Sequence, residues 1–178
     1  MSRGTLVLYQ LDRDELKRLS GELEALLASD DRAGLAALLE VDGAILGGRS
    51  RLVDFFLVAA GDEAADLLGA ATRRVAKKRA LTPVFASDSP ALEGRLRAYD
   101  ALRDDASAAA AVDKLLSPKR LPWYLRAPGA TCGWLGGAER HALAVRLERL
   151  RSALTPELAA FSVGLGEIDG DVVAHDSL

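Results

Sequence analysis

The stretch from Thr5 to Leu11, which reads Thr-Leu-Val-Leu-Tyr-Gln-Leu, decides how the fold begins. It is short, apolar and rich in residues that favour strands, so it predicts a β-strand. Asp12 follows as a good helix N-cap, and Glu15 three positions later completes an acidic variant of the capping box. The leucines beyond it recur at the spacing of one buried helix face: Leu16, Leu19, Leu23, Leu26 and Leu27.

Helices also dominate what the sequence predicts further along. A second helix around Leu35–Leu39 precedes a loop over Gly43–Gly48, and proline after Ser89 marks another helix start. Leu52–Ala60 is the most hydrophobic stretch, and its periodicity leaves helix and strand open. The other predicted helices cover residues 62–80, 90–102, 106–116, 138–153 and 156–161. Two of them carry apolar residues at helical spacing: Leu92, Leu96, Tyr99 and Leu102 in one, and Leu143, Leu147, Leu150 and Leu154 in the other.

The C-terminal tail supplies the second predicted strand. Asp169-Gly170 is typical of a hairpin turn, and Val172-Val173 follows it. We expect this strand to pair with the N-terminal one. Only 5% of the residues are aromatic, while alanine and leucine dominate the apolar set, which favours helix over strand. The predicted fold is therefore α+β and predominantly helical, a single compact domain over residues 1–178 with a small sheet from the two ends.

Charge and cysteine usage narrow the function classes. The net charge is −3, which argues against nucleic acid as a partner. The basic cluster Arg73, Arg74, Lys77, Lys78 and Arg79 is interpreted as a solvated helix end. A lone cysteine, Cys132, excludes an intramolecular disulfide and fits the cytoplasm. No run of 18 apolar residues occurs, so no membrane is expected as a partner.

Motifs that carry chemistry fail on inspection. His175-Asp176 resembles one part of a metal site, but His141 is the only other histidine and lies in a predicted helix. The acidic run Glu167, Asp169 and Asp171 lacks the calcium-loop pattern. Gly133–Gly137 matches no dinucleotide or phosphate loop, so its glycines are expected to let the chain turn into the next helix. The sequence therefore predicts no catalytic residue, no metal ligand and no cofactor.

The irregular segment Pro118–Gly137 is the candidate binding site. It gathers Trp123, Tyr124 and Trp134 beside Arg120 and Arg126, and these residue types are enriched at binding hot spots. The same aromatic residues could equally plug the core beneath a long loop. We expect Trp134 to be buried and Trp123 to be exposed.

The opening of the chain resembles a known group. Met-Ser-Arg-Gly, the strand and the leucine-rich helix from Asp12 are similar to small bacterial proteins of the YfbM-like type. The resemblance covers about the first 60 residues and the Trp134–Leu154 region. That group has no established activity, and similar small proteins are suspected immunity or antitoxin partners. The resemblance implies a binding role, and no functional residue is carried over from it.

These observations predict a non-catalytic protein-binding domain that neutralises a protein partner by occlusion, as an immunity or antitoxin protein does. The partner is expected to be a toxin or a second copy of the chain. Two alternatives stay open. One is a small enzyme that uses Cys132 or His141, since a thiolate needs a nearby base. The other is a homo-oligomeric structural or regulatory protein, joined through the Leu143–Leu154 helix.

Overall fold

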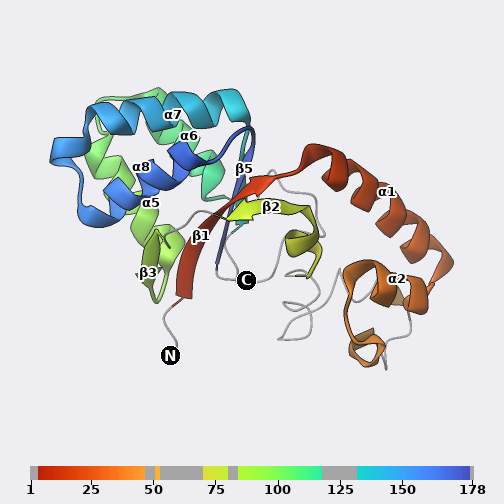
Figure 1. The fold of residues 1–178 in the computed structure, drawn as a ribbon. Coiled ribbons are helices and arrows are strands. Elements are labelled where there is room, and N and C mark those ends of the chain that lie inside the picture. The colour runs from red at the N-terminus through yellow and green to blue at the C-terminus, as the bar shows by residue number, and fades with distance from the viewer. Residues whose placement is uncertain (1–3, 47–50, 53–69, 80–83, 118–131, 177–178) are drawn as a thin grey trace. The chain divides into compact units, whose positions relative to one another are not determined.

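A computed structural model describes residues 4–46, 51–52, 70–79, 84–117 and 132–176 of the chain (Figure 1). The described residues fall into two compact units. The first holds residues 4–11, 76–79, 84–117 and 132–176, and the second holds residues 12–46, 51–52 and 70–75. The fold is α+β and predominantly helical, as the sequence predicts. A single domain over residues 1–178 stays a prediction.

The first unit is built on a five-stranded antiparallel sheet. β1 (Gly4–Leu11) is the central strand and pairs along one edge with β5 (Val172–Asp176). Its other edge pairs with β3 (Phe85–Ser87) near the start and with β2 (Ala76–Arg79) near the end. β4 (Cys132–Leu135) completes the sheet beside β5. The predicted pairing of the two ends of the chain is therefore confirmed.

The turn before β5 is not a hairpin turn. Gly170 does adopt a positive φ of 78°, which glycine tolerates without strain. Yet β5 pairs with β1 and β4, and two helices, within residues 137–167, lie between β4 and β5 along the chain. The Asp169-Gly170 turn instead joins β5 to α8 (Pro156–Glu167), a helix that continues past its predicted end at Phe161.

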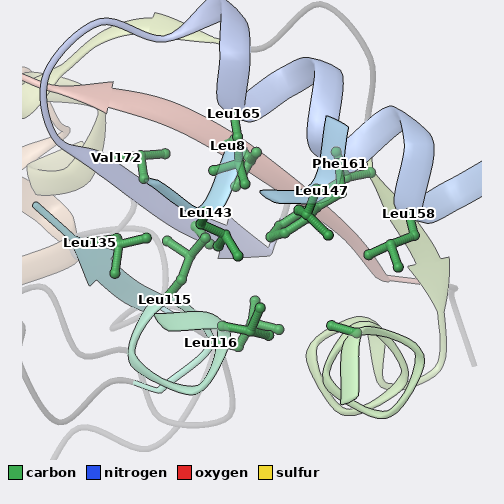
Figure 2. Close-up of a cluster of buried hydrophobic side chains, with 14 of the residues drawn as sticks. Leu8, Leu115, Leu116, Leu135, Leu143, Leu147, Leu158, Phe161, Leu165 and Val172 are labelled. Atoms are coloured by element: carbon green, nitrogen blue, oxygen red, sulfur yellow. The ribbon is translucent and has the colours of Figure 1, made fainter. Parts of the chain in front are cut away.

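Four helices accompany the sheet in the first unit: α5 (Pro90–Ala101), α6 (Ala106–Leu115), α7 (Gly137–Arg149) and α8. A short 3₁₀ helix, η4 (Arg151–Ala153), lies between the last two. Figure 2 shows the core that the sheet and helices share, with strand residues meeting helix residues. Its labelled members are Leu8, Leu115, Leu116, Leu135, Leu143, Leu147, Leu158, Phe161, Leu165 and Val172.

β1 is buried on both of its faces. Leu6 and Leu8 belong to the core shared with the helices, whereas Val7 and Tyr9 point to the opposite face and are buried as well. A strand covered on both sides has a continuous apolar run rather than an alternating one. This burial explains why the run from Leu6 to Tyr9 contains no polar residue.

The second unit contains α1 (Arg13–Ser29), α2 (Arg32–Leu39) and the 3₁₀ helix η1 (Gly43–Leu46), which replaces the start of the predicted loop. The carboxylate of Asp12 caps α1 by accepting from the amides of Asp14 and Glu15. The reciprocal half of the capping box is absent, because the Asp12 amide donates to the carbonyl of Val75. The Glu15 carboxylate pairs instead with Arg18 and Arg74.

The predicted helix over residues 62–80 ends early. Residues 70–75 are helical, but residues 76–79 form strand β2 against β1. The basic cluster is therefore divided between a helix end and a strand, and it is not one solvated helix terminus. Most of Leu52–Ala60 lies outside the described residues, so the choice between helix and strand stays open there. In the described part of the chain, no helix combines the length and the apolar character that crossing a membrane requires.

Candidate protein-binding surface

Helix α5 has an unusual division between its two faces. Proline stands at the first helical position after Ser89, as predicted, and the helix runs for 12 residues. Its inward face repeats every fourth residue and is mostly small: Pro90, Gly94, Ala98 and Leu102, the last just beyond the helix. The larger apolar residues of α5 lie on the other side of the helix.

Gly94 explains why the small residues face inward. A methyl group at Gly94 would come within 2.8 Å of the Phe85 ring, so only glycine lets that ring lie against the helix. Phe85 in turn packs against Phe161 of α8, with ring centroids 5.7 Å apart. The two aromatic rings fill the space that large side chains of α5 would otherwise take.

Three large apolar side chains of α5 are consequently exposed. Leu92 is 52% exposed, Leu96 60% and Tyr99 37%, and they lie at positions i, i+4 and i+7 of one helix face. We call these three residues the α5 strip. Leu92, Leu96, Tyr99 and Leu102 have the helical spacing that is typical of a buried face, but of these four only Leu102 is buried. Isolated exposed leucines are ordinary on protein surfaces, but a row of them on successive turns is typical of an interaction site.

A groove lies beside the strip. Its volume is about 700 Å³, and residues from β3, from the bend before α5, from α5 and from α8 line it. Its apolar lining includes Leu92 and Leu96, so the groove and the α5 strip form one surface. Among the residues that the structure describes, its charged lining consists of three carboxylates and one guanidinium: Asp88, Glu93, Glu157 and Arg97. We call it the acidic groove.

Arg97, the one cation among the described lining residues of the acidic groove, is already compensated. Arg97 pairs with Glu93 one turn earlier on α5 and with Glu157 of α8, the latter at 2.8 Å. Its hydrogen bond to Glu93 and the charge of Glu157 raise the pKa of Arg97 above its usual value. The carboxylates therefore outnumber the cation, and the groove is negatively charged around neutral pH.

The other flank of the strip joins α5 to α6. The Tyr99 hydroxyl donates to the Asp113 carboxylate at 3.3 Å, and Arg95 lies 3.4 Å from the same oxygen. Arg95 also donates to the carbonyl of Leu116 at 2.5 Å. Burial raises the pKa of Tyr99, and the charge of Asp113 raises it further. These contacts hold Tyr99 at the end of the strip.

The predicted aromatic site is described only at Trp134. Residues Arg120, Trp123, Tyr124 and Arg126 lie outside the described residues. Trp134 is half-buried in β4, and its indole N–H donates to the Asp171 carboxylate at 3.0 Å. The second oxygen of that carboxylate accepts from the Gly137 amide at 2.8 Å, at the start of α7. Trp134 is thus anchored to the fold by a buried acid.

Strand register places a different histidine opposite Cys132 than the one considered from sequence. Cys132 of β4 stands directly opposite His175 of β5, and His175 is buried. His141 lies on an exposed part of α7. Sequence reasoning missed this pairing because the two residues are 43 positions apart, and only the strand order brings them together. No local pattern marks this pairing, because β4, the strand that carries Cys132, has only four residues and was not predicted.

The glycine-rich stretch serves packing more than turning. A methyl group at Gly133 would lie 1.6 Å from the Leu115 carbonyl oxygen, so β4 passes directly against the end of α6. A methyl group at Gly137 would lie 3.1 Å from the backbone of Gly170. Neither residue has a positive φ. These two glycines therefore allow backbone segments to approach closely, and neither has the positive φ of a sharp turn.

The acidic tail residues do not converge on a common point. Asp171 is buried and its two oxygens accept from Trp134 and Gly137, while Asp169 is exposed and Glu167 ends α8. Among the residues that the structure describes, no group of three or more histidine, cysteine, aspartate or glutamate side chains is placed to hold a metal ion.

Comparison of the chain with protein-family models, with curated proteins and with solved structures finds no match. The resemblance to the YfbM-like group accordingly stays a prediction from the sequence.

Proposed function

We propose that this protein is a non-catalytic protein-binding domain that acts by covering its partner, in the manner of an immunity or antitoxin protein. The observation that supports this most is the α5 strip. Leu92 and Leu96 are more than half exposed on a helix whose inward face is filled by small residues. Burying such apolar area against a partner provides the main driving force of association.

Two further features support the proposal. The strip lies on a well-defined helix attached to a packed core, so little ordering is needed on binding, which favours affinity. The aromatic segment that contains Trp123, Tyr124, Arg120 and Arg126 would supply a second contact region, with Trp134 anchoring its end. The lone cysteine fits a protein of the cytoplasm.

Affinity purification from the source cells tests the proposal. The full chain is used as bait, beside a double variant, Leu92→Ser with Leu96→Ser. Val145→Ser is the matched control, because Val145 is 38% exposed on α7, away from the strip. We expect a stoichiometric partner with the wild type and the control, and its loss with the double variant. Equal recovery on all three baits would contradict the assignment of α5.

A cysteine-dependent enzyme is the second candidate, and the register of Cys132 opposite His175 is the observation that favours it. A nearby histidine lowers the pKa of a cysteine thiol, so the thiolate forms and reacts at pH values well below the ordinary pKa of cysteine. Labelling with iodoacetamide over a range of pH tests this. A thiol that reacts rapidly at pH ~6 in wild type and slowly in His175→Asn, as expected for a histidine-lowered pKa, supports an enzyme. A thiol that reacts only after unfolding removes this candidate.

A further inference from the structure

We infer that the α5 strip and the acidic groove together bind an amphipathic helix of a partner protein, with a leucine-type apolar face and basic residues flanking it. This inference rests on the proposed protein-binding function and adds the chemistry of the partner segment. It follows from the shape of the surface and from its charge, which are separate observations.

Shape favours a helix as the occupant. The three residues of the strip span seven residue steps of α5, or roughly 10 Å at the rise of an α-helix. A partner helix presents apolar residues at the same spacing, and packing such a face into an apolar groove is a common recognition mode. The acidic groove beside the strip offers about 700 Å³ for the side chains of that helix.

The charge of the groove indicates which polar residues flank the apolar face of the partner helix. Three carboxylates and one guanidinium line the groove, and Glu93 and Glu157 already share that guanidinium. Asp88, at the bend before α5, is exposed. Lysine or arginine side chains at the edge of the partner helix would compensate this excess, whereas acidic side chains would be repelled.

The same charges disfavour a second copy of this chain. A symmetric dimer centred on the acidic groove places that groove on the two-fold axis, where it faces its own counterpart. Asp100 adds another exposed carboxylate on α5, next to Tyr99. Like charges would therefore meet along the interface, which a basic partner helix avoids.

The test uses two synthetic probes and the full chain. One probe is a helical peptide of roughly 15 residues, long enough to hold some helix alone, with leucines on one face and lysines on its flanks. The other has glutamate in place of every lysine. Dye-labelled peptides are titrated with the protein, and fluorescence anisotropy gives the dissociation constants. We expect the lysine peptide to bind at least about ten-fold more tightly than the glutamate peptide. We also expect the affinity of the lysine peptide to fall as salt is added.

Variants locate the binding. Leu96→Ser should weaken binding of the lysine peptide at least about five-fold. Asp88→Lys should weaken binding of the lysine peptide and strengthen binding of the glutamate peptide. Val145→Ser is the matched apolar control. Glu24→Lys, an exposed position on α1, changes the net charge by the same amount as Asp88→Lys. Neither control should change either constant by more than about two-fold. Circular dichroism confirms that each variant is folded.

Four outcomes of the peptide titrations overturn the inference. They are no binding of the lysine peptide, equal binding of both peptides, equal weakening by Asp88→Lys and Glu24→Lys, and binding of the lysine peptide that Leu96→Ser leaves unchanged. Sedimentation that shows a dimer lost in Leu96→Ser assigns the face to a second copy and also overturns it. Failure with the peptides leaves the purification result intact, so the proposed function and this inference fail separately.

Discussion

Among the described glycines, Gly133 is the one that leaves least room for a side chain. It lies in β4 where the backbone of Leu115 crosses the strand, and a methyl group there would meet a carbonyl oxygen at 1.6 Å. Backbone atoms cannot move aside as a flexible side chain can. The strand and the helix end would have to separate, which loosens the core around Leu115 and Leu135.

We therefore expect Gly133→Ala to lower the free energy of unfolding by at least ~3 kcal/mol, as overpacking against backbone does. Gly166→Ala is the matched control, because the position is inside α8 and no atom beyond the adjacent backbone of that helix lies within 4 Å of a methyl group there. This control should gain about 0.5–1 kcal/mol from the better helix propensity of alanine. Urea unfolding measures both. A small effect of Gly133→Ala would show that β4 does not contact α6 as described.

The Asp171 carboxylate joins three segments of the first unit. One oxygen accepts from Trp134 of β4, the other accepts from Gly137 at the start of α7, and the residue itself precedes β5. A buried carboxylate that accepts two N–H donors is a strong anchor. Sequence reasoning grouped this residue with a calcium-like acidic run and did not foresee its role.

Asp171→Asn should cost about 1–3 kcal/mol, because an amide offers one acceptor oxygen where the carboxylate offers two. Trp134→Phe should cost about 1 kcal/mol for the lost indole donor. Since both changes remove the same hydrogen bond, the double variant should cost less than the sum. Asp169→Asn, at an exposed position nearby, is the control. Strictly additive losses would mean that Trp134 and Asp171 do not interact.

Helix α5 shows at the scale of an element why part of the site escaped prediction. Its start at Pro90 and its extent follow from local signals in the sequence. Its orientation does not, because the spacing of Leu92, Leu96 and Tyr99 predicts a buried face. The orientation of the helix depends on a tertiary contact with Phe85, whose ring requires a glycine at position 94. The four-residue repeat of small residues was present in the sequence, but size-based reasoning favours the larger side chains.

The orientation of α5 leads to a stability prediction. Leu96→Gln should change the free energy of unfolding by less than about 0.5 kcal/mol, because the side chain is largely exposed. Ala98→Leu should lower it by about 1–3 kcal/mol, because position 98 is buried in the core and has no room for three more carbons. Urea unfolding of the two variants measures the difference. The reverse ranking would mean that the strip faces inward.

Tyr99 gives a pH-dependent signature of the same helix. Its pKa is raised in the folded protein, first by burial and then by Asp113, so its ionisation opposes folding. Its stabilising contribution is complete below the unfolded pKa of about 10 and is lost as the pH rises through the folded pKa. The stability of wild type should therefore fall more steeply above pH ~10 than that of Tyr99→Phe. The slope of stability against pH for Asp113→Asn should lie between those of wild type and Tyr99→Phe. Identical slopes for all three proteins would exclude a raised pKa of Tyr99.

At the scale of the whole molecule, the sequence predicted the class of fold and the pairing of the two chain ends. β1 and β5 carry strong strand signals, and their apolar residues gain burial only by joining one sheet. The sequence did not predict β2, β3 or β4. These strands have four, three and four residues, too short for a periodic pattern, and they exist because β1 and β5 offer them edges.

The same limit applies to the binding surface. The acidic groove combines residues of β3, α5 and α8, and Asp88 and Glu157 are 69 positions apart in the sequence. No local pattern joins them. The aromatic segment was visible from composition alone, and its contact role stays a prediction. A sequence therefore shows that one continuous segment is rich in hot-spot residue types, but it does not show a groove that the fold assembles from distant residues.

The affinity of the chain for the partner that it captures measures directly whether α5 forms the binding surface. Titration calorimetry of the purified pair should show Leu96→Ser weakening binding by at least about 2 kcal/mol, the level of a hot-spot residue, with the fold unchanged. Val145→Ser should bind as wild type does. An affinity that is unchanged by Leu96→Ser and by Leu92→Ser would contradict the claim that this protein recognises its partner through α5.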